Sequence, residues 1–137
     1  MIRNNGRSKP DDSYATDKWI LQLVGHHYDP CPLNLNFDPL LDENGLLTDW
    51  VQESLPHNGK IFVNPPYSNV QPWITKAIQA VQDGCTVVML LKHDSSTRWY
   101  RELHEAGAHF LPIYRRLYFN SGKQASFPSV LAVLTSE

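Results

Sequence analysis

Apolar residues recur at helical spacing in three segments of the chain. Spacings of three and four residues place side chains on one face of a helix, which predicts helices over 16–24, 70–81 and 95–106. Thr16 is suited to cap the first helix and Ser95 or Ser96 the third, because a hydroxyl there can accept a backbone N–H. Each segment is followed by a glycine that would end the helix, namely Gly25, Gly84 and Gly107.

Short apolar runs between these segments have the length and composition of buried strands. They are Lys60 to Val63, Cys85 to Leu91, His109 to Ile113, Leu117 to Asn120 and Val130 to Leu134. Residues 26 to 45 hold three prolines among several leucines, which indicates an irregular but packed loop. The alternation of strands and helices predicts an α/β fold with a mostly parallel sheet flanked by helices.

Length and composition indicate one globular domain. The chain has 137 residues, 42% of them hydrophobic, which is enough for one compact core. Residues 1–13 lack periodicity and are expected to be a flexible lead-in, whereas residues 14–137 form the domain. No apolar run approaches the length of a membrane span or of a signal sequence, so a soluble cytoplasmic protein is expected.

Charge is distributed unevenly, although the formal net charge is only -2. From Asp29 to Glu53 there are six acidic residues and no Lys or Arg, whereas Lys92 to Lys123 is rich in Lys and Arg. The basic stretch could form a local positive face, or it could be ordinary solvated charge. The two cysteines and six histidines show no zinc-like spacing, so no metal is expected.

Candidate chemistry is concentrated in Asn64-Pro65-Pro66-Tyr67, directly after the strand Lys60 to Val63. Ligands of open α/β sheets gather at the carboxyl ends of strands. The Asn64 amide oxygen and the Pro65 carbonyl could each accept an N–H of an exocyclic amine, aligning the amine for attack on a methyl group. The two prolines would stiffen the turn.

Tyr67 completes this motif with a flat aromatic surface. A base inside a duplex cannot reach such a turn and must be flipped out, after which it could stack on Tyr67. The structural alternative is a proline-rich turn whose tyrosine packs in the core. The four tryptophans are best interpreted as packing residues.

The order of the segments resembles the phage-type DNA N-6-adenine methyltransferase family, the Dam-like enzymes of phages and prophages. The matching features run from residue 14 to residue 134: Trp19, Asp29-Pro30-Cys31, Gly45-Leu46, Asp49-Trp50, Asn64-Pro65-Pro66-Tyr67, Trp73, Val87 to Leu91, Arg98-Trp99, Arg116, Phe119 and Pro128-Ser129. This resemblance implies a compact Rossmann-like fold of S-adenosylmethionine-dependent methyltransferases, and transfer of a methyl group from S-adenosylmethionine to the exocyclic amine of adenine in DNA.

The resemblance also implies where the methyl donor binds. S-adenosylmethionine is expected between Asp29-Pro30-Cys31 and the catalytic turn, Asn64-Pro65-Pro66-Tyr67. Asp29 is the candidate that would accept hydrogen bonds from the ribose hydroxyls or the ammonium group of this donor. Asp49 is a second candidate. Either aspartate could instead cap its loop, an alternative of equal weight for Asp49 but of less weight for Asp29, which matches the segment that the family places at the donor. No glycine-rich loop follows the first predicted strand, so the usual backbone approach to the donor is not visible in the sequence.

DNA and S-adenosylmethionine are therefore the expected partners, in the cytoplasm of the host bacterium if a phage encodes the protein. Arg98, Arg115, Arg116 and Lys123 are the candidate phosphate contacts, although Arg116 could be a buried structural arginine. Selectivity would come from loops, from these basic residues, or from the partner subunit of a homodimer. The alternatives are methylation of RNA adenine or of a protein glutamine amide, or a catalytically degenerate phage module that only binds nucleic acid.

Overall fold

The computed structural model describes residues 17–31, 44–113 and 127–136. Four strands form one sheet: β1 (Lys60–Val63), β2 (Thr86–Lys92), β3 (His109–Ile113) and β4 (Ser129–Leu134). Their order across the sheet is β1-β2-β4-β3. An isolated parallel bridge between Tyr28 and Ile61 adds a further segment beside β1.

The expectation of a mostly parallel sheet needs correction. β1 and β2 are parallel, but β4 pairs in the antiparallel sense with β2 on one side and β3 on the other. Strands β1, β2 and β3 therefore point the same way, and β4 is inserted between β2 and β3 in the reverse direction. Its apolar sequence reads as a buried strand in either direction, so the sequence pattern could not fix its orientation.

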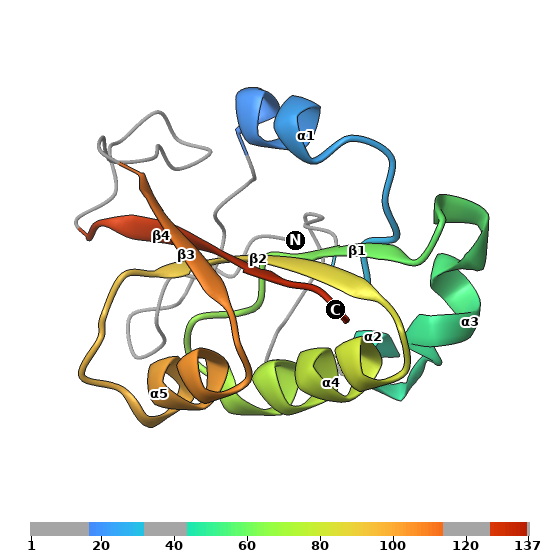
Figure 1. The fold of residues 1–137 in the computed structure, drawn as a ribbon. Helices are drawn as coiled ribbons and strands as arrows, with labels where there is room; N and C mark the ends of the chain where they lie inside the picture. Colours follow the sequence, from blue (N-terminus) through green and yellow to red (C-terminus); the bar gives the residue numbers. More distant parts are fainter. Residues whose placement is uncertain (1–16, 32–43, 114–126, 137) are drawn as a thin grey trace, which may run out of the picture.

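Helices cover both faces of the sheet (Figure 1). α1 (Lys18–Val24) lies on one face. α2 (Asn44–Leu47), α4 (Gln71–Gln82) and α5 (Arg98–Glu105) lie on the other, and α3 (Trp50–Ser54) lies toward one end of the sheet. A short 3-10 turn, η2 (Leu55–His57), leads from α3 towards β1.

Alternation along the strands divides the core between these two layers. Phe62 and Leu90 pack with Ile20 and Val24 of α1. Their neighbours along the strands face the larger cluster beneath α4 and α5, which includes Ile61, Val63, Met89, Leu91, Trp73, Ile74 and Leu103. Burial of each large apolar side chain contributes about 1.5–3 kcal/mol, so both helical layers are held to the sheet mainly by apolar packing.

Most predicted elements are confirmed to within a residue or two. Gly25, Gly84 and Gly107 all adopt positive φ where helices end. The third helix, however, is capped by Thr97, whose hydroxyl accepts the Tyr100 N–H, and not by Ser95 or Ser96.

The sequence did not predict α3, and the predicted irregular loop ends in the helical turn α2. Trp50 and Trp73 are core residues as expected, but Trp19 is 37% exposed. The strand predicted over 117–120, the cap Thr16 and the lead-in 1–13 lie outside the described residues.

Candidate functional site

The turn after β1 is held in place by its prolines. Pro65 and Pro66 are buried, and the Pro66 carbonyl accepts the Asn69 backbone N–H at 3.1 Å, which closes the turn before α4. Asn64 and Tyr67, the two residues with reactive or stacking side chains, are only half-buried. The backbone is thus fixed inside the molecule, while both side chains are partly exposed at the carboxyl end of β1, and the Tyr67 ring also packs against the larger core cluster.

Asn64 and Tyr67 are joined by a hydrogen bond. The Tyr67 hydroxyl donates to Oδ1 of Asn64 at 3.1 Å. This contact fixes the rotation of the amide and identifies Oδ1 as the acceptor on the tyrosine side. Because an amide oxygen can accept two hydrogen bonds, the geometry is compatible with a substrate N–H at the same atom.

Two further residues meet Tyr67 at this edge of the sheet, and the sequence did not single out either. Phe127 lies edge-to-face with Tyr67, with ring centroids 5.4 Å apart. Lys92, the last residue of β2, places Nζ 4.7 Å from the Phe127 centroid and 5.7 Å from the Tyr67 centroid. The sequence had included Lys92 only as the first residue of the basic stretch that ends at Lys123, and Phe127 carried no signal.

Asp29 belongs to a segment that runs beside β1. The Tyr28 N–H donates to the Lys60 carbonyl at 2.9 Å and the Phe62 N–H donates to the Tyr28 carbonyl at 3.0 Å. This pairing is parallel, so the chain leaving Tyr28 heads towards the end of β1 from which the turn Asn64-Pro65-Pro66-Tyr67 emerges. Both sequence-predicted segments therefore adjoin β1: the Asp29 segment runs beside the strand, and Asn64 directly follows its last residue.

The Asp29 side chain is half-buried. Its Oδ1 accepts the Cys31 backbone N–H at 2.9 Å. Burial raises the pKa of the Asp29 carboxyl, while the bond from Cys31 and the nearby His27 offset part of that rise. Pro30 and Cys31 are buried beside it. A half-buried carboxylate of this kind is suited to a cationic or hydroxyl-bearing ligand, whose contacts would compensate its partial desolvation.

Gly45 packs closely against Pro30, the residue that follows Asp29. A Cβ at Gly45 would lie 1.9 Å from the Pro30 carbonyl oxygen and 2.9 Å from the Trp73 ring, so only glycine fits. The Gly45 carbonyl in turn accepts Trp50 Nε1–H at 2.7 Å. Gly45, which sequence reasoning did not assign to the site, therefore allows α2 to pack directly against Pro30.

Asp49 serves as the N-cap of α3. Its Oδ1 accepts the Gln52 backbone N–H at 3.2 Å and its side chain is exposed. This is the capping role that the sequence left open. The arrangement accounts for Asp49 without a ligand. Asp29 likewise accepts a local backbone N–H, from Cys31, but its side chain is half-buried whereas that of Asp49 is exposed.

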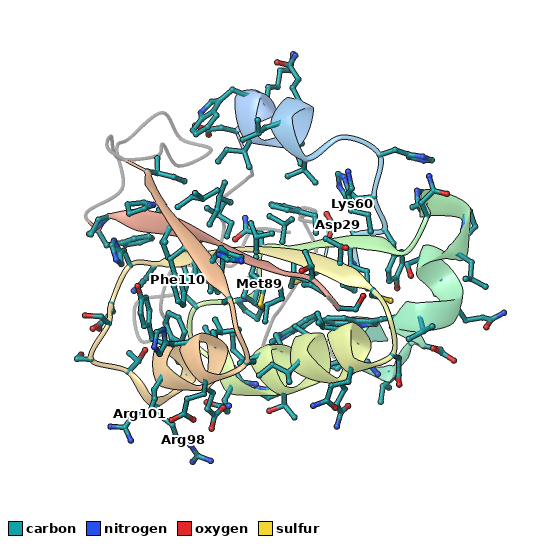
Figure 2. All side chains as sticks on the ribbon, viewed as in Figure 1. Asp29, Lys60, Met89, Arg98, Arg101 and Phe110 are labelled. Atoms are coloured by element: carbon teal, nitrogen blue, oxygen red, sulfur yellow. The ribbon has the colours of Figure 1, made fainter. Side chains whose placement is uncertain are left out.

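Of the predicted phosphate contacts, only Arg98 lies within the described residues. Its Nε donates to Glu102 at 3.0 Å, one turn along α5. Arg98 and the neighbouring Arg101 project away from the sheet (Figure 2). Arg115, Arg116 and Lys123 lie outside the described residues, so the structure tests only Arg98 among the four.

Neither a metal centre nor a membrane helix is found in the part of the chain that the structure describes. There, no three His, Cys, Asp or Glu side chains are grouped as metal ligands. None of the described helices has the length and apolarity needed to cross a bilayer.

Comparison with known proteins places the chain in a family. Over 113 residues it is 31% identical to the DNA N-6-adenine-methyltransferase of Haemophilus phage HP1, an alignment covering 73% of this chain and 61% of that protein. It is 33% identical over 54 residues to the DNA N-6-adenine-methyltransferase of Escherichia phage T1, covering 39% of this chain and 23% of that protein. The chain thus spans about three fifths or less of the length of these relatives.

No solved structure is significantly similar to the chain. Residues 7–129 match the model of the family described as DNA N-6-adenine-methyltransferase (Dam), a range that includes the turn Asn64-Pro65-Pro66-Tyr67 and the Asp29 segment. The resemblance inferred from the sequence is confirmed: this chain belongs to the DNA N-6-adenine-methyltransferase (Dam) family.

Proposed function

We propose that this protein transfers a methyl group from S-adenosylmethionine to the exocyclic amine of adenine in DNA. The observation that carries the proposal is the hydrogen-bonded pair Asn64 and Tyr67 at the carboxyl end of β1, in a chain of the Dam family. The names of the phage relatives favour adenine in DNA over the other amine substrates.

The catalytic turn supplies what attack by an adenine amine requires. The lone pair of this nitrogen is delocalised into the ring, and acceptors for its two N–H groups favour the tetrahedral geometry from which it can attack. Asn64 Oδ1 and the Pro65 carbonyl are the proposed acceptors. The nitrogen forms a bond to the methyl carbon as the methyl–sulfur bond breaks, and the proton lost from nitrogen passes to solvent.

The target base must leave the duplex to reach this turn. Tyr67 is half-buried, and its ring lies beside Asn64. Stacking on that ring would replace part of the stacking that the base loses. Pro65 and Pro66 act by holding the turn rigid, since both are buried.

Asp29, Pro30 and Cys31 are the proposed donor-binding segment. The donor carries a cationic sulfonium, an ammonium group and ribose hydroxyls, all of which suit a desolvated carboxylate such as Asp29. Asp49 is a weaker candidate than Asp29 for binding the donor, because it already caps α3. Three strands with a common direction and helices on both faces also support a Rossmann-like methyltransferase fold.

DNA binding is assigned to the basic residues of the second half of the chain. Arg98, Arg115, Arg116 and Lys123 remain the sequence-derived candidates for phosphate contacts. A protein of this kind would act on DNA in the cytoplasm of a host bacterium, as would be expected from its phage relatives. A homodimer would provide additional surface for recognising the sequence.

Incubation with labelled S-adenosylmethionine and DNA tests the proposal directly. After enzymatic digestion of the DNA, the label should appear in N6-methyl-2′-deoxyadenosine, and Asn64→Ala should reduce incorporation by at least about a hundredfold, as loss of a transition-state hydrogen-bond partner does elsewhere. Gln79→Ala removes an amide from the exposed side of α4 and should leave the rate unchanged. Label on cytosine, on RNA alone or on protein would refute adenine methylation of DNA.

A further inference from the structure

Lys92 occupies the same edge of the sheet as the catalytic turn. It ends β2, which runs parallel to β1, and its register partner in β4 is Ser129. The next backbone contact, from the His93 N–H to the Pro128 carbonyl at 3.0 Å, continues this pairing beyond the strand. The Lys92 backbone is therefore anchored on the β4 side, and its exposed side chain extends from a fixed point.

The ammonium group of Lys92 lies at two aromatic rings of the site. Nζ is 5.7 Å from the ring centroid of Tyr67 and 4.7 Å from that of Phe127. The two rings are themselves perpendicular, at 88°. A cation at this position is held beside the ring on which the target base is proposed to stack.

These cation–π contacts are weak enough to leave the ammonium available to an anion. At an exposed site each contributes about 0.5–1 kcal/mol. Asp94, the carboxylate two residues away, accepts two hydrogen bonds from Ser96, through its backbone N–H and its hydroxyl. In the described part of the chain the ammonium makes ring contacts and no ion pair; its charge adds only to the lowering of the pKa of Asp94 that the bonds from Ser96 mainly cause.

We propose that Lys92 binds a phosphate of the target nucleotide when its base stacks on Tyr67. This inference rests on the proposed function, because it requires DNA at the catalytic turn. A flipped nucleotide brings its own phosphates to the mouth of the site, and an ammonium with three donors is a suitable partner for them. Lys92 would then hold the extruded nucleotide in place without reading its sequence.

This assignment differs from the phosphate contacts predicted from the sequence. Arg98 forms an ion pair with Glu102 on α5 and points away from the sheet, whereas Lys92 contacts the catalytic tyrosine itself. Contacts far from the turn can add affinity for any duplex. A contact at Tyr67 is made only with the nucleotide that enters the site.

The test compares Lys92→Met with Lys92→Arg and with the matched control Lys76→Met. Lys76 makes the same kind of contact, with Nζ 5.9 Å from the Trp50 ring centroid, but lies on α4. Affinity for a fluorescent DNA duplex is measured by anisotropy between 50 and 200 mM salt, together with calorimetric binding of S-adenosylmethionine and the thermal midpoint.

Lys92→Met should bind DNA several-fold more weakly at 50 mM salt. The slope of log affinity against log salt should fall by about 0.9, the value for one phosphate contact, so the deficit should shrink about threefold at 200 mM. Lys92→Arg should restore the slope, and Lys76→Met should match the wild type. Donor affinity and the thermal midpoint should be unchanged in all three variants.

Two results would overturn the role of Lys92 alone: an unchanged salt slope in Lys92→Met, or a loss of DNA affinity that follows a lower thermal midpoint. The second would mean that the lysine only clamps the two rings. Failure of the wild-type protein to bind DNA at all would instead overturn the proposed function, and this inference with it.

Discussion

Replacing Tyr67 by phenylalanine removes one hydroxyl and keeps the ring. In the wild type that hydroxyl donates to Oδ1 of Asn64 at 3.1 Å, between two half-buried side chains. A neutral hydrogen bond contributes about 0.5–1.5 kcal/mol, and this one is longer than the usual O–H···O distance, so the lower half of the range applies. If the bond orients the amide for the transition state, Tyr67→Phe should reduce kcat about two- to fivefold.

The ring of the same residue has a separate role that a second variant isolates. Tyr67→Ala should lose the hydrogen bond and also the stacking surface, which is worth about 1–3 kcal/mol per base. Its KM for DNA should therefore rise, whereas that of Tyr67→Phe should stay near the wild-type value. Steady-state kinetics with labelled donor and varied DNA separates the two parameters.

Two outcomes would refute this division of roles. An unchanged kcat in Tyr67→Phe would show that Asn64 needs no help from the hydroxyl. A higher kcat would show that the hydroxyl competes with the substrate amine for Oδ1. The thermal midpoint is the control, since a large fall in either variant would indicate that Tyr67 is mainly a core residue.

Three further perturbations test the site and its surroundings. Asp29→Asn keeps an oxygen for the Cys31 N–H but removes a carboxylate whose pKa burial raises. A carboxylate with a raised pKa makes the fold less stable as pH rises through its folded-state pKa. At neutral pH the variant should therefore melt at or above the wild-type temperature. Its affinity for S-adenosylmethionine should fall at least about tenfold by calorimetry, as for loss of a charged hydrogen bond, and unchanged affinity would remove Asp29 from the donor site. Gly45→Ala should lower the free energy of unfolding in urea by about 1–3 kcal/mol, because its Cβ would collide with the Pro30 carbonyl; a stability equal to wild type would contradict that contact. Burial, with His26 and His27 adding to it, lowers the pKa of His57 below 6.5. The free energy of unfolding should therefore decline as pH falls through about 6.5, and less steeply in His57→Gln. Equal slopes of this free energy against pH in the two proteins would exclude His57 as the cause.

The elements that the sequence predicted well are those decided by local chemistry. β1, β2 and β3 are short apolar runs, and their bounds follow from composition. Three helix ends follow from Gly25, Gly84 and Gly107, because a left-handed residue is needed there and glycine adopts it without strain. The motif at Asn64 could likewise be placed at a strand end from local sequence alone, because only the apolar strand before it had to be recognised.

What the sequence could not supply depends on contacts between distant segments. Asp49 could equally bind a ligand or cap a helix until the position of Gln52 was known. Nothing near Gly45 in the sequence indicates that it packs against Pro30. The meeting of Lys92 and Phe127 is likewise a product of strand pairing, so no local pattern could have assigned either residue to the site.

The reversed direction of β4 brings Phe127 next to Tyr67 in the turn after β1. In the observed sheet the start of β4 lies beside the end of β2, with Ser129 opposite Lys92, so Phe127 reaches Tyr67. Had β4 run parallel to β2, as the sequence pattern suggested, its first residues would lie at the opposite edge of the sheet, far from the turn after β1. The second aromatic ring and the position of the Lys92 ammonium therefore both depend on one antiparallel pairing. It follows that substitutions which weaken the β2–β4 pairing should impair the site even when they lie far from Asn64 in the sequence.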